Sequence, residues 1–172
     1  RLKPMCWPRR EGGSAAAPLK GTVMLGELVC DKEGGGVAAW RLLATDVLAI
    51  DGKATATQPL QKRLALLESE VLNPRRAPGV DTTAEILRVR KKDCYRLKYI
   101  PYLIKQFIPK LTHPADGLTF LRAEEPHPCV RPTRLGTQSA PAVIEWSSDG
   151  GGEGSGVPQS DLLAWAEKYF AS

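Results

Sequence analysis

The chain has 172 residues, of which 42% are hydrophobic and 25% are charged. These fractions are close to the average of globular domains, so they exclude a wholly disordered chain, and the length suits one domain with a real core. No apolar run approaches the roughly eighteen residues that a membrane helix needs, and the net charge of +5 is a mild excess that suits an anionic partner.

Two apolar runs in the first third of the chain predict a β-hairpin. Val23–Cys30 has β-branched residues near its ends and ends at a polar segment, so it predicts a buried strand. Trp40–Ile50 is a second such run, and it ends at Asp51-Gly52, a strong turn signal. The glycine-rich segment 33–36 between the two runs would form the hairpin turn.

The hydrophobic period changes from a strand to a helix pattern after Pro59. Residues 59–73 carry leucine and valine at the spacing of one helix face, and Pro74 is expected to end the helix. The apolar positions are Leu60, Leu64, Leu67 and Val71, and the positions expected in solvent are Lys62, Arg63, Glu68 and Glu70.

The later elements alternate between short strands and helices. Ile86–Arg90 predicts a strand with one wet face, and Leu97–Leu111 predicts a helix with a proline near each end. Leu118–Leu121 and Ala142–Trp146 predict two further short strands. The expected fold class is therefore α+β with a mainly antiparallel sheet.

The C-terminal part predicts a separate helix behind a linker. Residues 148–158 are rich in Gly and Ser and have no core-forming content. Ser160 is a good N-cap for a short amphipathic helix that must dock on its own domain or on a partner, through residues 160–170. The expected organisation is a domain over 1–147, a linker over 148–158 and a docking helix over 159–172.

A basic run lies in the middle of the chain, where only Asp93 opposes six cationic residues. Such a run neutralises the phosphates of a nucleic acid, or it forms a solvated edge strand and helix face on which lysines discourage edge pairing. Both interpretations stay open from the sequence. The residues are Arg88, Arg90, Lys91, Lys92, Arg96 and Lys98.

Single residues outside these runs have ordinary structural interpretations. The four cysteines are scattered without zinc-ligand spacing, which favours reduced and mostly buried thiols in an intracellular protein. Trp40, Trp146 and Trp165 are expected in the core, and His113, next to a proline, is expected in a loop. The cysteines are Cys6, Cys30, Cys94 and Cys129.

Four short segments follow one another in a distinctive order. Residues 25–29 (LGELV) fit the pattern D-G-E-[LM]-[IV], and residues 42–52 (LLATDVLAIDG) fit hydrophobic residues, an aromatic, Asp and then I-I-x-[IF]-[NSD]-G. Residues 63–75 fit R-L-x-x-[IL]-E-x-E-[IV]-[IL]-x-P-R, and residues 113–120 (HPADGLTF) fit H-E-x-D-G-[LI]-I-F. As an ordered set, these segments resemble the nucleotidyltransferase (ATP-grasp-like) domain of eukaryotic mRNA capping enzymes, from its third motif onward.

This resemblance implies a chemistry and a set of site residues. In that family a lysine in K-x-D-G-x-R attacks the α-phosphate of GTP, and the lysyl-N–GMP intermediate then passes GMP to diphosphate-ended RNA. It implies that Glu27 contacts the ribose or the catalytic Mg²⁺ or Mn²⁺, that Asp116 helps to bind this metal, and that Thr45, Asp46 and Trp146 lie in the nucleotide pocket. Arg88, Arg90, Lys91 and Lys92 would contact the RNA phosphates.

The sequence also departs from the family pattern. It contains no K-x-D-G motif, and Thr45 stands where the family has an aromatic residue that stacks on guanine. Glu145 and Ser147 flank Trp146 where the family has two phosphate-gripping lysines. Without a partner, Glu27 in an apolar strand would be costly to bury, and Asp46 could also cap a turn or pair with Arg41.

Three functional hypotheses follow from the resemblance and these departures. The chain is part of a nuclear mRNA guanylyltransferase that takes GTP as substrate and binds the RNA 5′ end. Alternatively, it is a catalytically inactive module that binds a cap nucleotide or RNA. The third hypothesis is a scaffold subunit that docks on a protein partner through residues 160–170.

Overall fold

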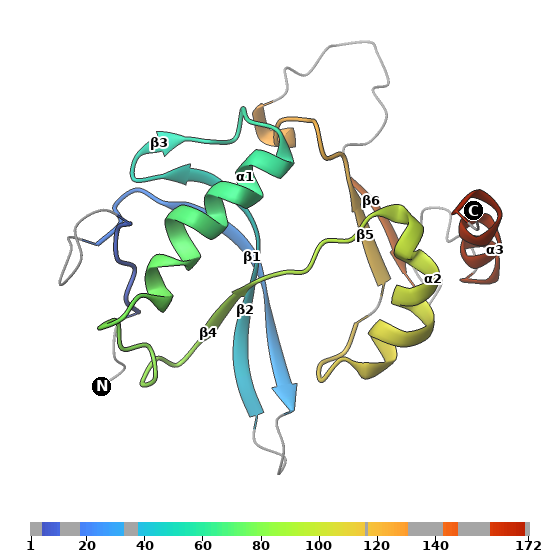
Figure 1. Ribbon diagram of the computed structural model, residues 1–172, viewed down its shortest axis with the longest axis horizontal. Coiled ribbons are helices and arrows are strands. Elements are labelled where there is room, and N and C mark those ends of the chain that lie inside the picture. Colours follow the sequence, from blue (N-terminus) through green and yellow to red (C-terminus); the bar gives the residue numbers. More distant parts are fainter. Residues whose placement is uncertain are drawn as a thin grey trace. The chain divides into compact units, whose positions relative to one another are not determined.

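A computed structural model describes residues 5–10, 18–32, 38–115, 117–130, 143–147 and 159–170 (Figure 1). The chain divides into two compact units. The first unit comprises Arg1–Lys92 and Arg122–Ser139, and the second comprises Asp93–Leu121 and Ala140–Ser172. The predicted 148–158 linker lies outside the described residues, and the predicted division into 1–147, 148–158 and 159–172 stays a prediction.

The first unit is built on a sheet whose central strand is β2 (Ala38–Ile50). β2 pairs antiparallel with β1 (Val23–Lys32) and with the two-residue β3 (Lys53–Ala54). β4 (Arg88–Lys91) pairs with β2 in parallel on the side away from β1. The predicted antiparallel pairing of the first two strands is confirmed, while the turn predicted over 33–36 lies outside the described residues. The strand predicted over Ile86–Arg90 begins two residues later than expected.

The predicted Asp51-Gly52 turn joins β2 to β3. Both residues have positive φ, 49° for Asp51 and 80° for Gly52, as a tight hairpin turn requires. The Asp51 carboxylate accepts hydrogen bonds from the Arg9 side chain at 2.7 Å and from the Lys20 amide at 3.2 Å. These contacts tie the N-terminal segment to the end of the sheet.

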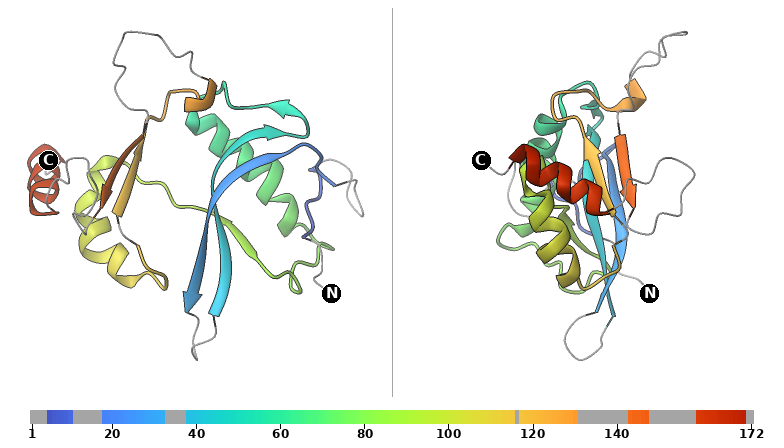
Figure 2. Two further views of the ribbon diagram at one scale, coloured as in Figure 1. Left: turned by 180° about the vertical axis from the view of Figure 1, so that it is seen from behind. Right: turned by 90° about the vertical axis from the view of Figure 1, so that its right-hand side faces the viewer.

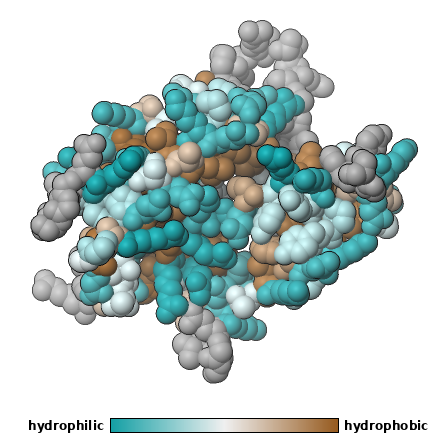
Figure 3. Space-filling view, viewed as in Figure 1, coloured by the Kyte–Doolittle hydropathy of each residue, from teal (hydrophilic) through white to brown (hydrophobic). Residues whose placement is uncertain are grey.

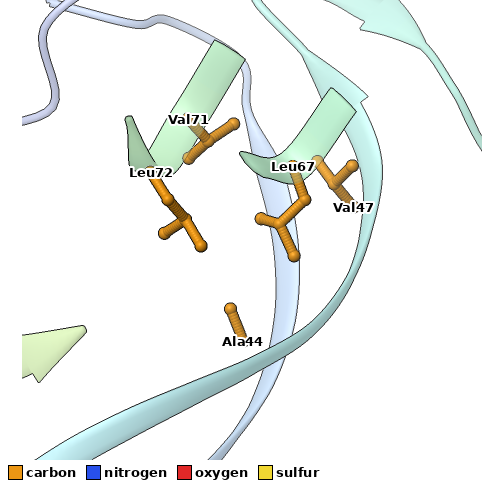
Figure 4. Packing of buried hydrophobic residues seen from close by; sticks show 5 residues of the cluster. All are labelled: Ala44, Val47, Leu67, Val71 and Leu72. Atoms are coloured by element: carbon orange, nitrogen blue, oxygen red, sulfur yellow. The ribbon is translucent and has the colours of Figure 1, made fainter. Parts of the chain in front are cut away.

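One long helical segment covers β2, as the heptad-like spacing predicts. It consists of α1 (Leu60–Leu66), the π-helical η1 (Leu67–Leu72) and the 3-10 turn η2 (Pro74–Arg76). Pro74 therefore does not end the helical path but begins its last turn, a position where its missing N–H costs nothing. The buried cluster between helix and sheet contains Ala44, Val47, Leu67, Val71 and Leu72 (Figure 4).

Strand β1 is mostly exposed, so the expectation of a buried strand is wrong. Among the described residues β1 pairs only with β2, and the buried cluster packs on β2. Leu28 keeps 56% of its surface exposed, and Val23 and Leu25 are also exposed. An apolar run shows that a strand forms but not which neighbours cover it.

The second unit contains a helical segment, a two-stranded sheet and a terminal helix. The helical segment is made of η3 (Leu97–Tyr99), α2 (Ile100–Tyr102), η4 (Leu103–Phe107) and η5 (Ile108–Lys110), which confirms the predicted helix. β5 (Gly117–Leu121) pairs antiparallel with β6 (Val143–Ser147), close to the predicted bounds. His113 lies in the loop before β5, as expected.

Helix α3 (Gln159–Phe170) docks within the second unit. Its Ala166 is fully buried with Ile100 and Ile104, and Leu162 and Leu163 pack on the same cluster. In the right-hand view of Figure 2, α3 crosses in front of the helical segment that contains α2. The helix begins at Gln159, so Ser160 lies inside it and is not the N-cap. Of the two predicted docking possibilities, the structure shows contact with the chain's own second unit.

Two expectations about single side chains are wrong. Three of the four cysteines, Cys6, Cys94 and Cys129, are exposed, although all four are free. Trp40 and Trp165 are exposed as well, with 48% and 42% of their surface accessible. Residue type sets only a tendency toward burial, and Trp40 lies at the start of β2, beyond the part that the helix covers.

Candidate nucleotide and RNA site

Glu27 and Lys92, two predicted site residues, form a direct ion pair. Glu27 stands opposite Leu43 in the β1–β2 ladder, and Lys92 follows β4, where its amide donates to the Ala44 carbonyl at 2.8 Å. The Lys92 Nζ donates to both Glu27 carboxylate oxygens, at 2.5 and 2.6 Å. Both side chains are partly exposed, so solvent screens the pair and ligands can reach its carboxylate.

The pairing registers define a polar face on the side of the sheet away from α1. Glu27 on β1 and Arg90 on β4 are both paired with Leu43 on β2, so their side chains lie on the same face of the sheet. Side chains alternate between the two faces along a strand, which places Lys92 on the same face as Arg90. Thr45 occupies a β-bulge between Ala44 and Asp46, and because side chains do not alternate regularly at a bulge, the register does not fix the face of Thr45. We call the set Glu27, Arg90 and Lys92 the polar face of the sheet.

Asp46 lies on the opposite side, where it is buried beneath α1. The Arg63 guanidinium grips its carboxylate with both ends, Nε to Oδ1 at 2.8 Å and Nη2 to Oδ2 at 2.7 Å. The Val47 amide donates to the same Oδ1 at 2.7 Å. Asp46 therefore does not face the same space as Glu27, and a direct contact from its carboxylate to a nucleotide stays a prediction. The alternative pairing with Arg41 is wrong, because Arg41 pairs with Asp31.

Arg63 is a structural residue whose burial the sequence interpretation missed. Only 3% of its surface is exposed, although it was expected in solvent. Its Nη1 also donates to the Gln58 carbonyl at 2.5 Å and to the Glu125 carbonyl at 3.1 Å. One guanidinium thus joins α1, β2 and the returning segment 122–130 in the first unit. The sequence signal for this burial was the R-L motif, because an arginine that belongs to a family motif is expected to have a role other than keeping the helix soluble.

The four predicted RNA-contacting residues do not form one surface. Lys91 points to the helix side, where it donates to Glu68 at 2.5 Å, and Lys92 points to the polar face. Alternation along β4 places Arg88 on the face of Arg90 and Lys92, and Arg88 also lines a small open pocket with Arg75 and Arg76. Two of the four cations are thus neutralised by glutamates inside the first unit, which leaves less positive charge for RNA than the sequence count suggests.

Two predicted residues belong to the second unit. Asp116 lies outside the described residues, immediately before β5. Trp146 lies on β6, where its backbone is paired with Leu118. Their predicted roles in metal and nucleotide binding stay predictions.

The residues present can supply only part of a metal site. Among the described residues, no group of three or more His, Cys, Asp or Glu side chains could hold a metal ion. Glu27 offers an accessible carboxylate, and hard oxygen ligands suit Mg²⁺. Magnesium characteristically keeps several waters and is bound by one or two carboxylates together with substrate phosphates. The polar face fits such a substrate-borne metal.

Three surface carboxylates of the first unit have lowered pKa values. The hydrogen bond and the charge of Lys91 lower the pKa of Glu68, and the hydrogen bond from Arg10 lowers the pKa of Glu70. The Lys20 amide and then the Arg9 guanidinium lower the pKa of Asp51. Each of these groups stays ionised at neutral pH and stabilises its salt bridge there.

The sheet and its covering helices define an α+β domain, and comparison with known proteins shows its family. The family model described as "mRNA capping enzyme, catalytic domain" matches residues 1–135. The chain belongs to this family, as the ordered motifs predict. Among the described residues, no helix is long and apolar enough to cross a membrane.

A curated relative agrees with the family assignment. The chain is 30% identical over 136 residues to the mRNA-capping enzyme subunit alpha of Neurospora crassa. The match covers 75% of this chain and 32% of the relative. The chain therefore spans about a third of the length of that enzyme.

Proposed function

We propose that the chain is a nucleotide- and RNA-binding part of an mRNA-capping guanylyltransferase, a protein that works in the nucleus. In this proposal the polar face of the sheet binds GTP with Mg²⁺ or Mn²⁺, and GMP is transferred to diphosphate-ended RNA. The single observation that carries the proposal is the pairing of Glu27 with Lys92 on the sheet face that also carries Arg90, within a chain of the capping-enzyme family.

The geometry gives each residue of this face a task. The Glu27 carboxylate would accept from ribose hydroxyls or bind the metal, and Lys92 would turn from Glu27 toward a phosphate when substrate enters. In the family pattern Thr45 would lie beside the base, but it has no aromatic ring to stack on it. The bound metal would supply charge neutralisation for the triphosphate.

The covalent step needs a lysine that this chain does not supply in a K-x-D-G motif. In the proposed reaction the amine nitrogen attacks the α-phosphorus of GTP and pyrophosphate leaves. An oxygen of the RNA 5′-diphosphate then attacks the same phosphorus, and the nitrogen–phosphorus bond breaks. The chain's own residues would bind and orient the nucleotide for both steps.

An adduct assay with a matched pair of variants tests the proposal. The full-length protein is incubated with α-labelled GTP and Mg²⁺ or Mn²⁺, and the covalent adduct is measured. Glu27→Gln is expected to reduce adduct formation about 10-fold or more, because a hydrogen bond to a charged group contributes about 1.5–3 kcal/mol. Glu68→Gln is the control, since Glu68 also pairs with a lysine but on the helix side. If Glu27→Gln and Glu68→Gln reduce adduct formation equally, the polar face is not the nucleotide site.

The inactive binding module remains the second candidate because of Thr45, Glu145 and Ser147. These residues replace a stacking ring and two lysines of the family pattern, which weakens the case for catalysis. If the full-length protein forms no adduct, the enzyme proposal fails. Titration of the purified chain with a cap analogue would then support the module if binding is measurable and strongly salt-dependent.

A further inference from the structure

A group of exposed tyrosines stands out on the helical segment of the second unit. Tyr95, Tyr99 and Tyr102 keep 42%, 43% and 43% of their surface exposed. They precede or lie within η3 and α2, close together along the segment. The buried residues of the same segment are aliphatic, namely Ile100, Leu103 and Ile104. The tyrosines are thus not needed to fill the core.

The rings are arranged as one connected patch around Phe107. The Tyr95 ring centroid lies 5.4 Å from that of Phe107, and the Tyr102 centroid lies 6.4 Å from it. Tyr99 joins the patch through Tyr95, at 6.3 Å and nearly edge to face. Edge-to-face and tilted contacts cover only part of each ring, so the exposed part of each tyrosine ring stays available to a ligand.

The helical segment that carries the patch is rich in cationic residues. From Cys94 to Lys110 the sequence has four cationic residues and no Asp or Glu. The Lys98 Nζ lies 5.4 Å from the centre of the Tyr99 ring. Lys105 pairs with Glu167 of α3, and the segment carries three further cationic residues, Arg96, Lys98 and Lys110. Figure 3 shows pale and teal residues next to brown ones in the region of α2.

We propose that this tyrosine patch, Tyr95, Tyr99 and Tyr102 with Lys98, is a binding platform for single-stranded RNA. Exposed aromatic faces stack on unpaired bases of any sequence, and neighbouring cations neutralise the backbone phosphates. An acidic peptide would match the charge but would not use three rings. The platform belongs to the second unit and the polar face of the sheet to the first. RNA binding by the platform requires neither GTP nor the nucleophilic lysine, so its test is independent of the adduct assay.

The test is fluorescence anisotropy of the whole chain with a labelled 12-residue oligouridine that has a 5′-hydroxyl and so cannot be capped. Tyr99→Leu or Tyr102→Leu is expected to raise Kd about 5- to 100-fold, because each removes a stacking ring. Tyr99→Phe keeps the ring and is expected to stay within about 2-fold. Leucine retains apolar volume, and thermal melting of each variant checks that the second unit stays folded.

Trp40→Leu provides the matched control. Trp40 is also an exposed aromatic residue, but it lies on β2 in the first unit. The Trp40→Leu substitution is expected to leave RNA affinity unchanged. Lys98→Ala is expected to reduce the salt dependence of RNA binding. The platform is overturned if wild-type chain does not bind the oligonucleotide, if Tyr99→Leu binds like wild type, or if Trp40→Leu weakens binding as much. Equal affinity for a polyglutamate peptide would also overturn it.

Discussion

Replacement of Arg63, the buried arginine of α1, should destabilise the first unit strongly. Arg63→Met keeps much of the aliphatic length of the side chain but removes the guanidinium that binds Asp46 and two backbone carbonyls. Asp46, with 6% of its surface exposed, would then be a buried carboxylate with only one amide donor. Loss of one partner of a buried ion pair costs about 3–5 kcal/mol.

That cost is a large part of the stability of an ordinary domain. Folded domains have a free energy of unfolding of about 5–15 kcal/mol. For a chain of this length each kcal/mol lowers Tm by about 2–4 °C, so Arg63→Met should lower Tm by about 6–20 °C. The assay is thermal and urea denaturation followed by circular dichroism.

Two further variants separate the ion pair from a general effect of the substitution. Lys62→Met changes the adjacent, exposed position and should alter stability by no more than about 0.5 kcal/mol. Arg63→Met combined with Asp46→Leu removes both charges and should be more stable than Arg63→Met alone, because no buried charge is left unpaired. The reasoning is refuted if Arg63→Met unfolds within about 1 kcal/mol of wild type, or if the double variant is the least stable.

Three other predictions concern the first unit. Gly26→Ala should destabilise by about 1–3 kcal/mol in urea denaturation, since its Cβ would lie 2.9 Å from the Leu43 carbonyl oxygen; wild-type stability would contradict this close approach. Leu67→Ala should cost about 2–5 kcal/mol in the same assay because Leu67 is fully buried, and a smaller loss would mean that the cluster collapses around the cavity. The lowered pKa of Glu68 means that its pair with Lys91 stabilises the fold above the unfolded-state pKa and stops doing so as pH falls through the folded-state pKa. The Tm advantage of wild type over Glu68→Gln should therefore shrink as pH falls below the ordinary glutamate pKa of about 4.3, and a difference that stays constant with pH would contradict this.

Family membership could be predicted from the sequence because it depends on short motifs and on their order along the chain. Hydrophobic periodicity located the strands and helices within about two residues, and the Asp51-Gly52 turn follows from backbone preferences at these two positions. The ordered motifs gave the family that the comparison confirms. None of these inferences needs knowledge of which elements become neighbours.

The sequence alone also determined that Glu27 would have a partner or a function, because an ionised group in an apolar run requires one. Only the tertiary structure decided that this partner is Lys92, since the parallel pairing of β4 with β2 joins residues 65 positions apart. It also decided that Arg63 is buried and that β1 is exposed. Burial and ion pairing depend on how distant segments pack, and periodicity along the chain contains no information about that.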